Sequence, residues 1–215
     1  MFPLAVILGA AGLATVVVMG SIFGVIAIFG SRAKKLLQQH FASVIDHFGM
    51  DMDATLETPK KGFPSIEGYF FGRGFHMYMT KKTSGDSTII MTHYALEFKT
   101  KHAKLLVLRK ETKIHRLQKR MGNLVEHEIG WAPFDKLYLL KTQDGQYLDN
   151  VFDDKLVDLF IDAYSHMRGY FEVVGSELIY TESLSINSHK QRLRFQKMIE
   201  LGLFMADRLE WTLND

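Results

Sequence analysis

The chain has 215 residues, with 26 Lys or Arg, 24 Asp or Glu and no cysteine. The lack of cysteine excludes disulfide bonds, thiolate catalysis and Cys-bound zinc or iron–sulfur sites, and it is typical of a reducing compartment. The net charge of +2 is too small to indicate a partner, so the distribution of charge along the chain has to be considered instead.

Residues 1–30 carry no charged side chain. About 20 apolar residues cross a bilayer as a helix, so this stretch predicts a single transmembrane anchor. A cleaved secretory signal is the alternative, but the stretch lacks a basic N-terminal region and its apolar core is too long. Arg32, Lys34 and Lys35 follow at once. This positive flank predicts a protein of the bacterial inner membrane with its N-terminus outside and its C-terminal domain in the cytoplasm.

Small residues in this stretch recur at steps of three or four once Val16 is included, so they would share one helix face. Gly20 and Gly24 have the small-xxx-small spacing that lets two membrane helices approach closely. The general abundance of glycine in membrane helices is the alternative explanation. We interpret the stripe as a packing face for another membrane helix, formed by Gly9, Gly12, Gly20, Gly24 and Ala27.

Three segments follow the predicted anchor. Residues 31–49 have apolar side chains at helical spacing, including Leu37 and Phe41, and predict a juxtamembrane amphipathic helix. Such a helix either packs on the domain or lies on the membrane surface. Residues 50–65 are rich in helix and strand breakers and are expected to form a linker. Residues 66–215 are long enough for one soluble domain with its own core.

Within residues 66–215 the hydrophobic period changes several times. Aromatic-rich stretches with a period of two predict strands, and pairs such as Asp144-Gly145 predict turns. Longer stretches with a helical period predict helices, one of which begins at a cap formed by Asp153 or Asp154. This order of elements predicts an α+β domain built on antiparallel sheet with packed helices. The expected strands are 69–73, 75–79, 87–99, 104–109, 125–129, 136–142, 170–174 and 177–181, and the expected helices are 111–121, 153–168 and 188–211.

Two short motifs accompany this pattern. Gly72-Arg73 stands near the start of the domain, and Phe134-Asp135 precedes a predicted strand that ends in basic residues. With the order of elements around them, these motifs resemble a group of uncharacterised bacterial membrane-anchored proteins that share a domain of unknown function. The resemblance covers residues 66–210. It implies an architecture, and it implies no activity or cofactor.

Patterns for catalysis and metal binding are weak. A single Gly-x-Gly pair lacks the third glycine of a dinucleotide-binding fingerprint, and the serines show no nucleophile motif. Asp154, Asp158, Asp162 and His166 follow each other at steps of four and would align on one helix, so the last three are a weak metal candidate. A solvated acidic face explains the row equally well. We expect no catalytic residue, no metal and no cofactor.

The most uneven charge lies in residues 99–120. This segment holds nine basic residues and Glu111 as its only acid, a net charge of +8 that leaves −6 for the rest of the chain. Anionic lipids or an acidic protein partner would be attracted to such a surface. A solvated face, partly paired with the acidic helix after Asp153, is the alternative, and the aromatic residues typical of a nucleic-acid site are scarce. The candidate lipid- or partner-binding residues are Lys99, Lys101, Lys104, Arg109, Lys110, Lys113, Arg116, Lys119 and Arg120.

These features predict a non-catalytic accessory or assembly subunit of a membrane protein complex. One helix would anchor the chain among other integral membrane proteins, and the cytoplasmic domain would contact them. Anionic lipids are a further expected partner, and nucleic acid is not expected. The alternative is a membrane-anchored sensor that binds a ligand or lipid, or an enzyme with an unrecognised site. The glycine stripe and the charge asymmetry favour the accessory subunit.

Overall fold

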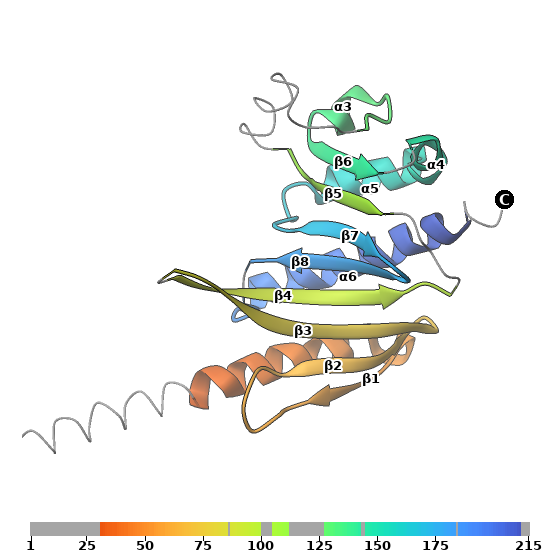
Figure 1. Ribbon diagram of the computed structural model, residues 1–215. Helices are drawn as coiled ribbons and strands as arrows, with labels where there is room; N and C mark the ends of the chain where they lie inside the picture. Colours follow the sequence, from red (N-terminus) through yellow and green to blue (C-terminus); the bar gives the residue numbers. More distant parts are fainter. Residues whose placement is uncertain are drawn as a thin grey trace, which may run out of the picture.

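The computed structural model describes residues 31–85, 87–99, 105–111, 127–142, 145–183 and 185–211. Within them, one eight-stranded antiparallel sheet has the order β1-β2-β3-β4-β8-β7-β5-β6 (Figure 1). The strands are β1 Met52–Glu57, β2 Ser65–Phe70, β3 Arg73–Ser84, β4 Ser87–Glu97, β5 Leu106–Lys110, β6 Tyr138–Thr142, β7 Tyr170–Val174 and β8 Glu177–Glu182. The helices are residues 31–48, the 3-10 turn η1 Gly49–Asp51, α3 Ala132–Asp135, α4 Gly145–Val151, α5 Asp154–Ala163 and α6 His189–Trp211.

The long β3–β4 hairpin defines the two faces of the sheet. Along β3, Phe75, Met77 and Met79 are buried, whereas the residues between them point to the other face and are more exposed. This period of two is what a strand buried on one face requires. Met77 lies opposite Tyr94 of β4, and both side chains are fully buried. The core therefore lies on the face that Phe75 and Tyr94 share.

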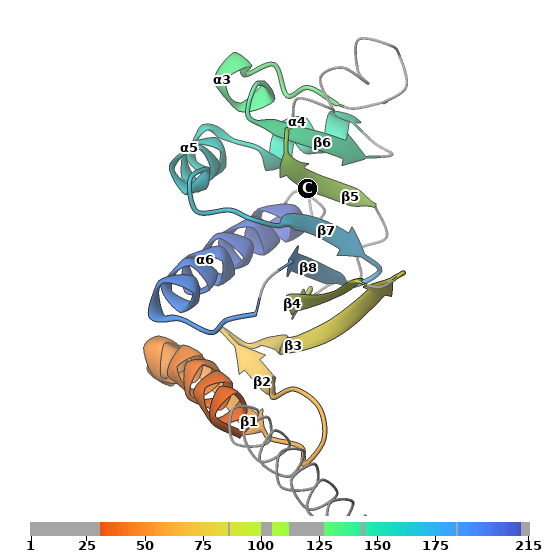
Figure 2. The ribbon, with the colours of Figure 1, turned by 90° about the vertical axis from the view of Figure 1, so that its left-hand side faces the viewer.

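Helices cover this core face of the sheet (Figure 2). The ring of Phe195 on α6 packs edge-on against Tyr94, with the ring centroids 5.7 Å apart. The Tyr94 hydroxyl donates a hydrogen bond to the carbonyl of Met198. A Cβ at Gly202 would lie 2.1 Å from that hydroxyl oxygen. Glycine at position 202 therefore permits the close approach of α6 to β4.

The helix of residues 31–48 packs on the same core. Its Phe41 and Val44 side chains are fully buried. The Gln196 side chain of α6 donates a hydrogen bond of 3.0 Å to the carbonyl of Ser43, so the two helices are also joined through polar groups. Of the two arrangements considered for this helix, the structure shows packing on the domain.

Arg73 joins the start of β3 to the end of α6. Its side chain is 2% exposed and forms ion pairs of 2.5 Å with Asp207 and 2.6 Å with Glu210. Burial alone would lower the pKa of Arg73, but the hydrogen bonds to Glu210 and Asp207 outweigh burial and raise it. The preceding β2–β3 turn has positive φ at both Phe71 and Gly72, as in a type I′ hairpin turn.

The other end of the sheet has an aromatic cluster of its own. The ring centroid of Phe134 on α3 lies 5.0 Å from that of Tyr138 of β6 and 6.2 Å from that of Phe160 of α5. The Tyr138 hydroxyl donates a 2.6 Å hydrogen bond to the carbonyl of Phe160. Asp153 caps α5 by accepting a 2.9 Å hydrogen bond from the backbone N–H of Leu156, which confirms the predicted cap.

The predicted fold class requires a correction, because it joined a transmembrane helix to the α+β domain. No helix in the residues that the structure describes is both long and apolar enough to cross a membrane. The 23-residue helix α6 has the length, but its charged residues alternate with apolar ones because only one side of it faces the core. Outside the described residues lie the predicted anchor, residues 1–30, and its packing residues Gly9, Gly12, Gly20, Gly24 and Ala27.

The prediction of a linker over residues 50–65 is also wrong. This segment contains β1, which pairs with β2 from Met52 opposite Phe70 to Glu57 opposite Ser65. A Cβ at Gly68 of β2 would lie 2.2 Å from the carbonyl oxygen of Asp53, so only glycine lets the two strands approach this closely. The folded domain consequently includes the helix of residues 31–48 and strand β1, and it does not begin at residue 66.

Two other local predictions differ from the structure. Gly145, expected in a turn, is the first residue of α4. The strand expected over residues 125–129 is, among the described residues, a single bridge between His127 and Leu140. The helix expected over residues 111–121 lies outside the described residues, except for Glu111 itself.

Candidate functional site

The face of the sheet opposite the helices carries the polar side chains of the alternating pattern. We call it the open face, because none of the described helices covers it (Figure 2). It is turned toward the viewer in Figure 1. Strands β2, β3, β4 and β8 contribute Glu67, His76, Tyr78, His93 and Glu177 to its centre.

Three rings stack at the centre of the open face. The ring centroids of His76 and Tyr78 are 4.6 Å apart, and those of Tyr78 and His93 are 4.8 Å apart. Nε2 of His93 lies 2.8 Å from Oγ1 of Thr80, and its Nδ1 lies 2.9 Å from Oγ1 of Thr181. Burial lowers the pKa of His93, so its ring is neutral at pH 7. Both ring nitrogens of His93 are held by threonine hydroxyls, so neither is free to exchange a proton with a substrate. The ring is better suited to form part of a rigid contact surface.

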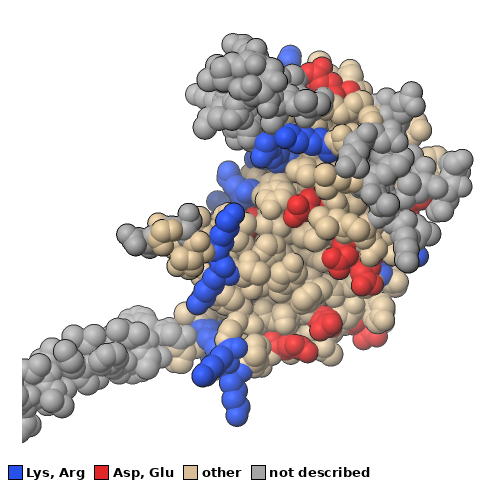
Figure 3. All heavy atoms as spheres, in the orientation of Figure 1, with Lys and Arg blue, Asp and Glu red and all other residues tan. Residues whose placement is uncertain are grey.

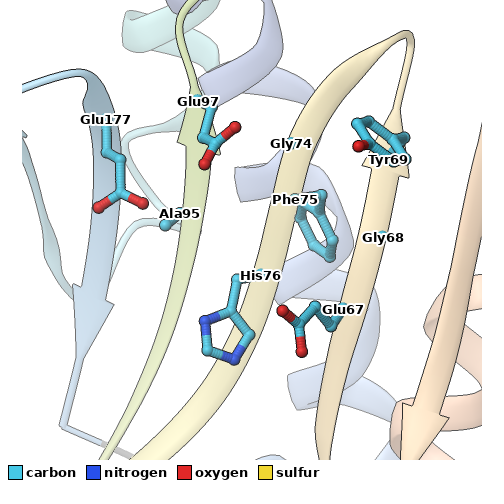
Figure 4. Close-up of a pocket in the computed structure, with 9 residues that line it drawn as sticks. All are labelled: Glu67, Gly68, Tyr69, Gly74, Phe75, His76, Ala95, Glu97 and Glu177. Atoms are coloured by element: carbon cyan, nitrogen blue, oxygen red, sulfur yellow. The ribbon is translucent and has the colours of Figure 1, made fainter.

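A hollow of about 250 Å³ lies beside this stack (Figure 4). We call it the acidic hollow, because its lining includes Glu67, Glu97 and Glu177 together with His76. A Cβ at Gly74 would lie 2.2 Å from a carboxylate oxygen of Glu97, so the lack of a side chain there makes room for that carboxylate. Glu97 and Glu177 are opposite each other on β4 and β8. Like charges in this relation repel, and a cationic group bound between them would relieve the repulsion.

Two neighbouring groups stay protonated more readily than usual. Burial raises the pKa of the Glu172 carboxyl. Burial, and after it the carboxylates of Glu177 and Glu172, raises the pKa of Tyr78. The phenol of Tyr78 is therefore a neutral hydrogen-bond donor on an aromatic face, which suits contact with a cation or a polar backbone.

Charge is unevenly distributed over the open face. Acidic side chains gather toward the end that holds the acidic hollow, and basic side chains gather toward the opposite end, near the tip of the β3–β4 hairpin (Figure 3). The side chain of Lys82, which the alternation along β3 places on this face, is exposed near that tip. The face consequently presents opposite potentials to a partner at its two ends.

The predicted metal candidate is not assembled. In the parts of the chain that the structure describes, no group of three or more His, Asp or Glu side chains could hold a metal ion. Asp154, Asp158 and Asp162 are exposed on α5, which ends at Ala163, so His166 lies beyond the helix. The three aspartates form a solvated acidic face, which was the alternative interpretation of the sequence.

The predicted basic segment is described only in part. Lys110 points to the helical side, where its Nζ lies 4.0 Å from the ring centroid of Tyr164, and burial followed by the charge of Arg168 lowers the pKa of Lys110. Arg109 lies opposite Tyr170 of β7, on the open face. These two neighbours therefore belong to different faces. Lys99 is exposed, and outside the described residues lie Lys101, Lys104, Lys113, Arg116, Lys119 and Arg120.

The motif residues of the sequence resemblance stabilise the fold. Arg73 is buried in its ion pairs, and Phe134 is 1% exposed in the aromatic cluster. Oδ1 of Asp135 accepts a hydrogen bond of 3.2 Å from the backbone N–H of Ile129. The centre of the open face was missed from the sequence, although the alternation of His76 and Tyr78 with buried residues along β3 was a signal for it.

Comparison with known proteins shows a likeness of fold to a solved structure. No family model matches the chain, and no curated protein matches it. Among solved structures, the chain is similar to the crystal structure of the mycobacterial trehalose monomycolate transport factor A, TtfA. The TM-score is 0.52 at 12% sequence identity, and the match covers 80% of this chain and 94% of that chain. At this identity the similarity shows a shared fold.

Proposed function

We propose that this chain is a non-catalytic accessory factor of a membrane transport complex and that it binds its partner through the open face of the sheet. The observation that carries the proposal is the fold shared with TtfA, a transport factor, over 94% of that chain. Because one fold can serve many functions, the character of the open face is the second support.

The open face suits a cationic segment of a partner protein. The stacked rings of His76, Tyr78 and His93 form a flat, pre-ordered aromatic surface. The carboxylates of Glu97 and Glu177 lie beside it, and they gain when a cation is placed between them. Lys or Arg side chains of a partner would stack on the rings and pair with the carboxylates. Fixed aromatic and charged groups of this kind give an interface its specificity.

The alternative of an enzyme or a small-molecule sensor receives less support from the same geometry. The acidic hollow has a volume of about 250 Å³, below the range of roughly 300–1,000 Å³ that is typical of ligand pockets. His93, the most buried imidazole of the stack, has both nitrogens engaged by Thr80 and Thr181. Contact with a macromolecule uses the whole face, whereas a small ligand would use the hollow alone.

The proposal includes a location. Arg32, Lys34 and Lys35 open the described part of the chain, and basic residues are attracted to the anionic lipids of a cytoplasmic leaflet. We therefore propose that the domain works at the cytoplasmic side of the bacterial inner membrane, beside the integral membrane proteins of the transport complex.

The test is co-purification of the full-length chain from mildly solubilised membranes, with partners identified and quantified by mass spectrometry. Reversing charge in the double variant Glu97→Lys/Glu177→Lys should reduce the recovered membrane partner at least tenfold, because the variant repels a cationic segment. The matched control, Asp158→Lys/Asp162→Lys, reverses two exposed acids on α5 and should retain the partner.

Two results would overturn the proposal. One is a wild-type chain that purifies without a stoichiometric membrane protein. The other is equal partner recovery by the wild type and the open-face variant, which would exclude the open face as the binding surface.

A further inference from the structure

A second cavity lies at the end of the core near the β3–β4 hairpin, and nothing in the proposed function uses it. Its volume is about 380 Å³, and its walls are mostly apolar. Leu37 comes from the helix of residues 31–48, Phe63 and Pro64 come from the β1–β2 loop, and Met79 and Ile90 come from β3 and β4. We call it the end pocket. An apolar cavity of this size, open to the surface, is suited to a hydrocarbon group.

Lysines surround the mouth of the end pocket. Lys34 is part of the lining, and its Nζ donates hydrogen bonds of 2.5 Å to the carbonyl of Pro59 and 3.1 Å to the carbonyl of Lys60. The Nζ of Lys81 lies 5.4 Å from the ring centroid of Phe63, another lining residue. We call this group the lysine rim; its members are Lys34 of the helix, Lys60 and Lys61 of the β1–β2 loop that lines the pocket, and Lys81 of β3.

The lysine rim is not neutralised by ion pairs within the described part of the chain. The ion pairs there join other residues, and Lys60, Lys61 and Lys81 of the rim are exposed. Two exposed apolar side chains lie nearby: Leu36, 43% exposed, is on the helix that carries Lys34, and Ile89, 45% exposed, precedes Ile90 of the pocket lining. Positive charge and apolar surface at one end of a domain match the two chemical parts of an anionic amphiphile.

We propose that the end pocket and the lysine rim bind an anionic phospholipid of the bilayer surface. The lipid's acyl chain enters the pocket between Leu37, Phe63 and Ile90, and its phosphate is held by the rim lysines. Leu36 and Ile89 then contact the boundary between head groups and acyl chains. This inference concerns a surface different from the open face and does not rest on the proposed function.

The lysine rim requires a negative charge on the ligand, and the apolar pocket requires a hydrocarbon chain. A zwitterionic lipid satisfies the pocket but not the lysines, whereas inorganic phosphate satisfies the lysines but not the pocket. Only a ligand with both parts gains both interactions. Binding should also weaken with salt, because screening at physiological ionic strength acts over roughly 8 Å and the rim is exposed.

The experiment titrates the full-length chain, in a mild non-ionic detergent, with dioctanoyl phosphatidylglycerol, dioctanoyl phosphatidylcholine and inorganic phosphate, and measures binding by isothermal calorimetry. We expect phosphatidylglycerol to bind at least tenfold more tightly than either of the other two. Lys60→Glu/Lys61→Glu changes only exposed loop residues and should weaken that binding at least tenfold. Ile90→Trp, which fills the pocket, should weaken it as well.

The matched control is Lys155→Glu/Lys197→Glu, which reverses two exposed lysines on α5 and α6 and should bind phosphatidylglycerol like the wild type. Equal affinity for phosphatidylcholine would overturn the role of the lysine rim. Equal affinity for inorganic phosphate would identify a site for the free anion and overturn the lipid proposal. An equal loss in the control and in Lys60→Glu/Lys61→Glu would show that net charge, and not this site, governs binding.

Discussion

Gly202 lies where α6 crosses directly over Tyr94 of the sheet. Replacing it with Ala places a Cβ against the Tyr94 hydroxyl, and Tyr94 is fully buried among aromatic rings and cannot easily move. We expect Gly202→Ala to lower the free energy of unfolding by about 1–3 kcal/mol through overpacking. In a helix without such a clash, the same substitution would instead raise the free energy of unfolding by about 1 kcal/mol, so the sign of the change distinguishes the two cases. Urea unfolding followed by circular dichroism measures the difference.

A double-mutant cycle separates this clash from other effects of the substitution. In a Tyr94→Phe background the hydroxyl that the new Cβ meets is gone, so Gly202→Ala should cost less there than in the wild type. The same cost in both backgrounds would show that Tyr94 is not the residue that requires glycine at position 202.

The sequence pattern could not predict how the residues of the open face meet. His76 and His93 belong to different strands, and they stack on Tyr78 only because His93 lies opposite Tyr78 in the β3–β4 register. Glu97 and Glu177 likewise meet through the pairing of β4 with β8. Alternation assigns a residue to a face, but register decides its neighbours, and register depends on the whole sheet.

At the scale of single elements, α5 offers a test of a predicted feature. Asp153 caps this helix, so Asp153→Ala should lower the free energy of unfolding by about 1 kcal/mol through the lost cap. The partly exposed ion pair of Asp153 with Arg208 adds only a small further loss. Asp154→Ala, one position later and exposed, is the control and should cost clearly less. Similar losses in thermal unfolding for the two variants would argue against the cap.

Elements with a strong local signal were predicted well, and those that depend on neighbours were not. The β7–β8 hairpin lies at its predicted place because both strands alternate and Gly175 supplies the positive φ of the turn. Strand β1 was missed because it follows a helix at once and precedes a segment rich in breakers; its strand conformation depends on pairing with β2. Helix α4 was missed because Asp144-Gly145 has the composition of a turn.

At the scale of the whole molecule, the two proposed surfaces lie at different places, and this separation can be tested. The acidic hollow and the end pocket share no lining residue. Glu97→Lys/Glu177→Lys should therefore keep its affinity for phosphatidylglycerol in the calorimetric titration, and Lys60→Glu/Lys61→Glu should keep its partner in co-purification. If either variant loses both kinds of binding, the two surfaces are coupled or the fold is damaged, and near-ultraviolet circular dichroism distinguishes these outcomes.

The strand order also governs when the domain can fold. The centre of the sheet joins β4 to β8, and the hydroxyl of Tyr94 reaches the carbonyl of Met198 on α6, 104 residues later in the chain. Such distant pairings require the closure of long loops before they contribute stability, so they slow folding. During synthesis, β1 to β4 emerge after the helix of residues 31–48, and the part of their apolar face that α6 covers stays exposed until α6 has left the ribosome. The stage of synthesis at which α6 is still missing is therefore the one at which this protein most needs a chaperone.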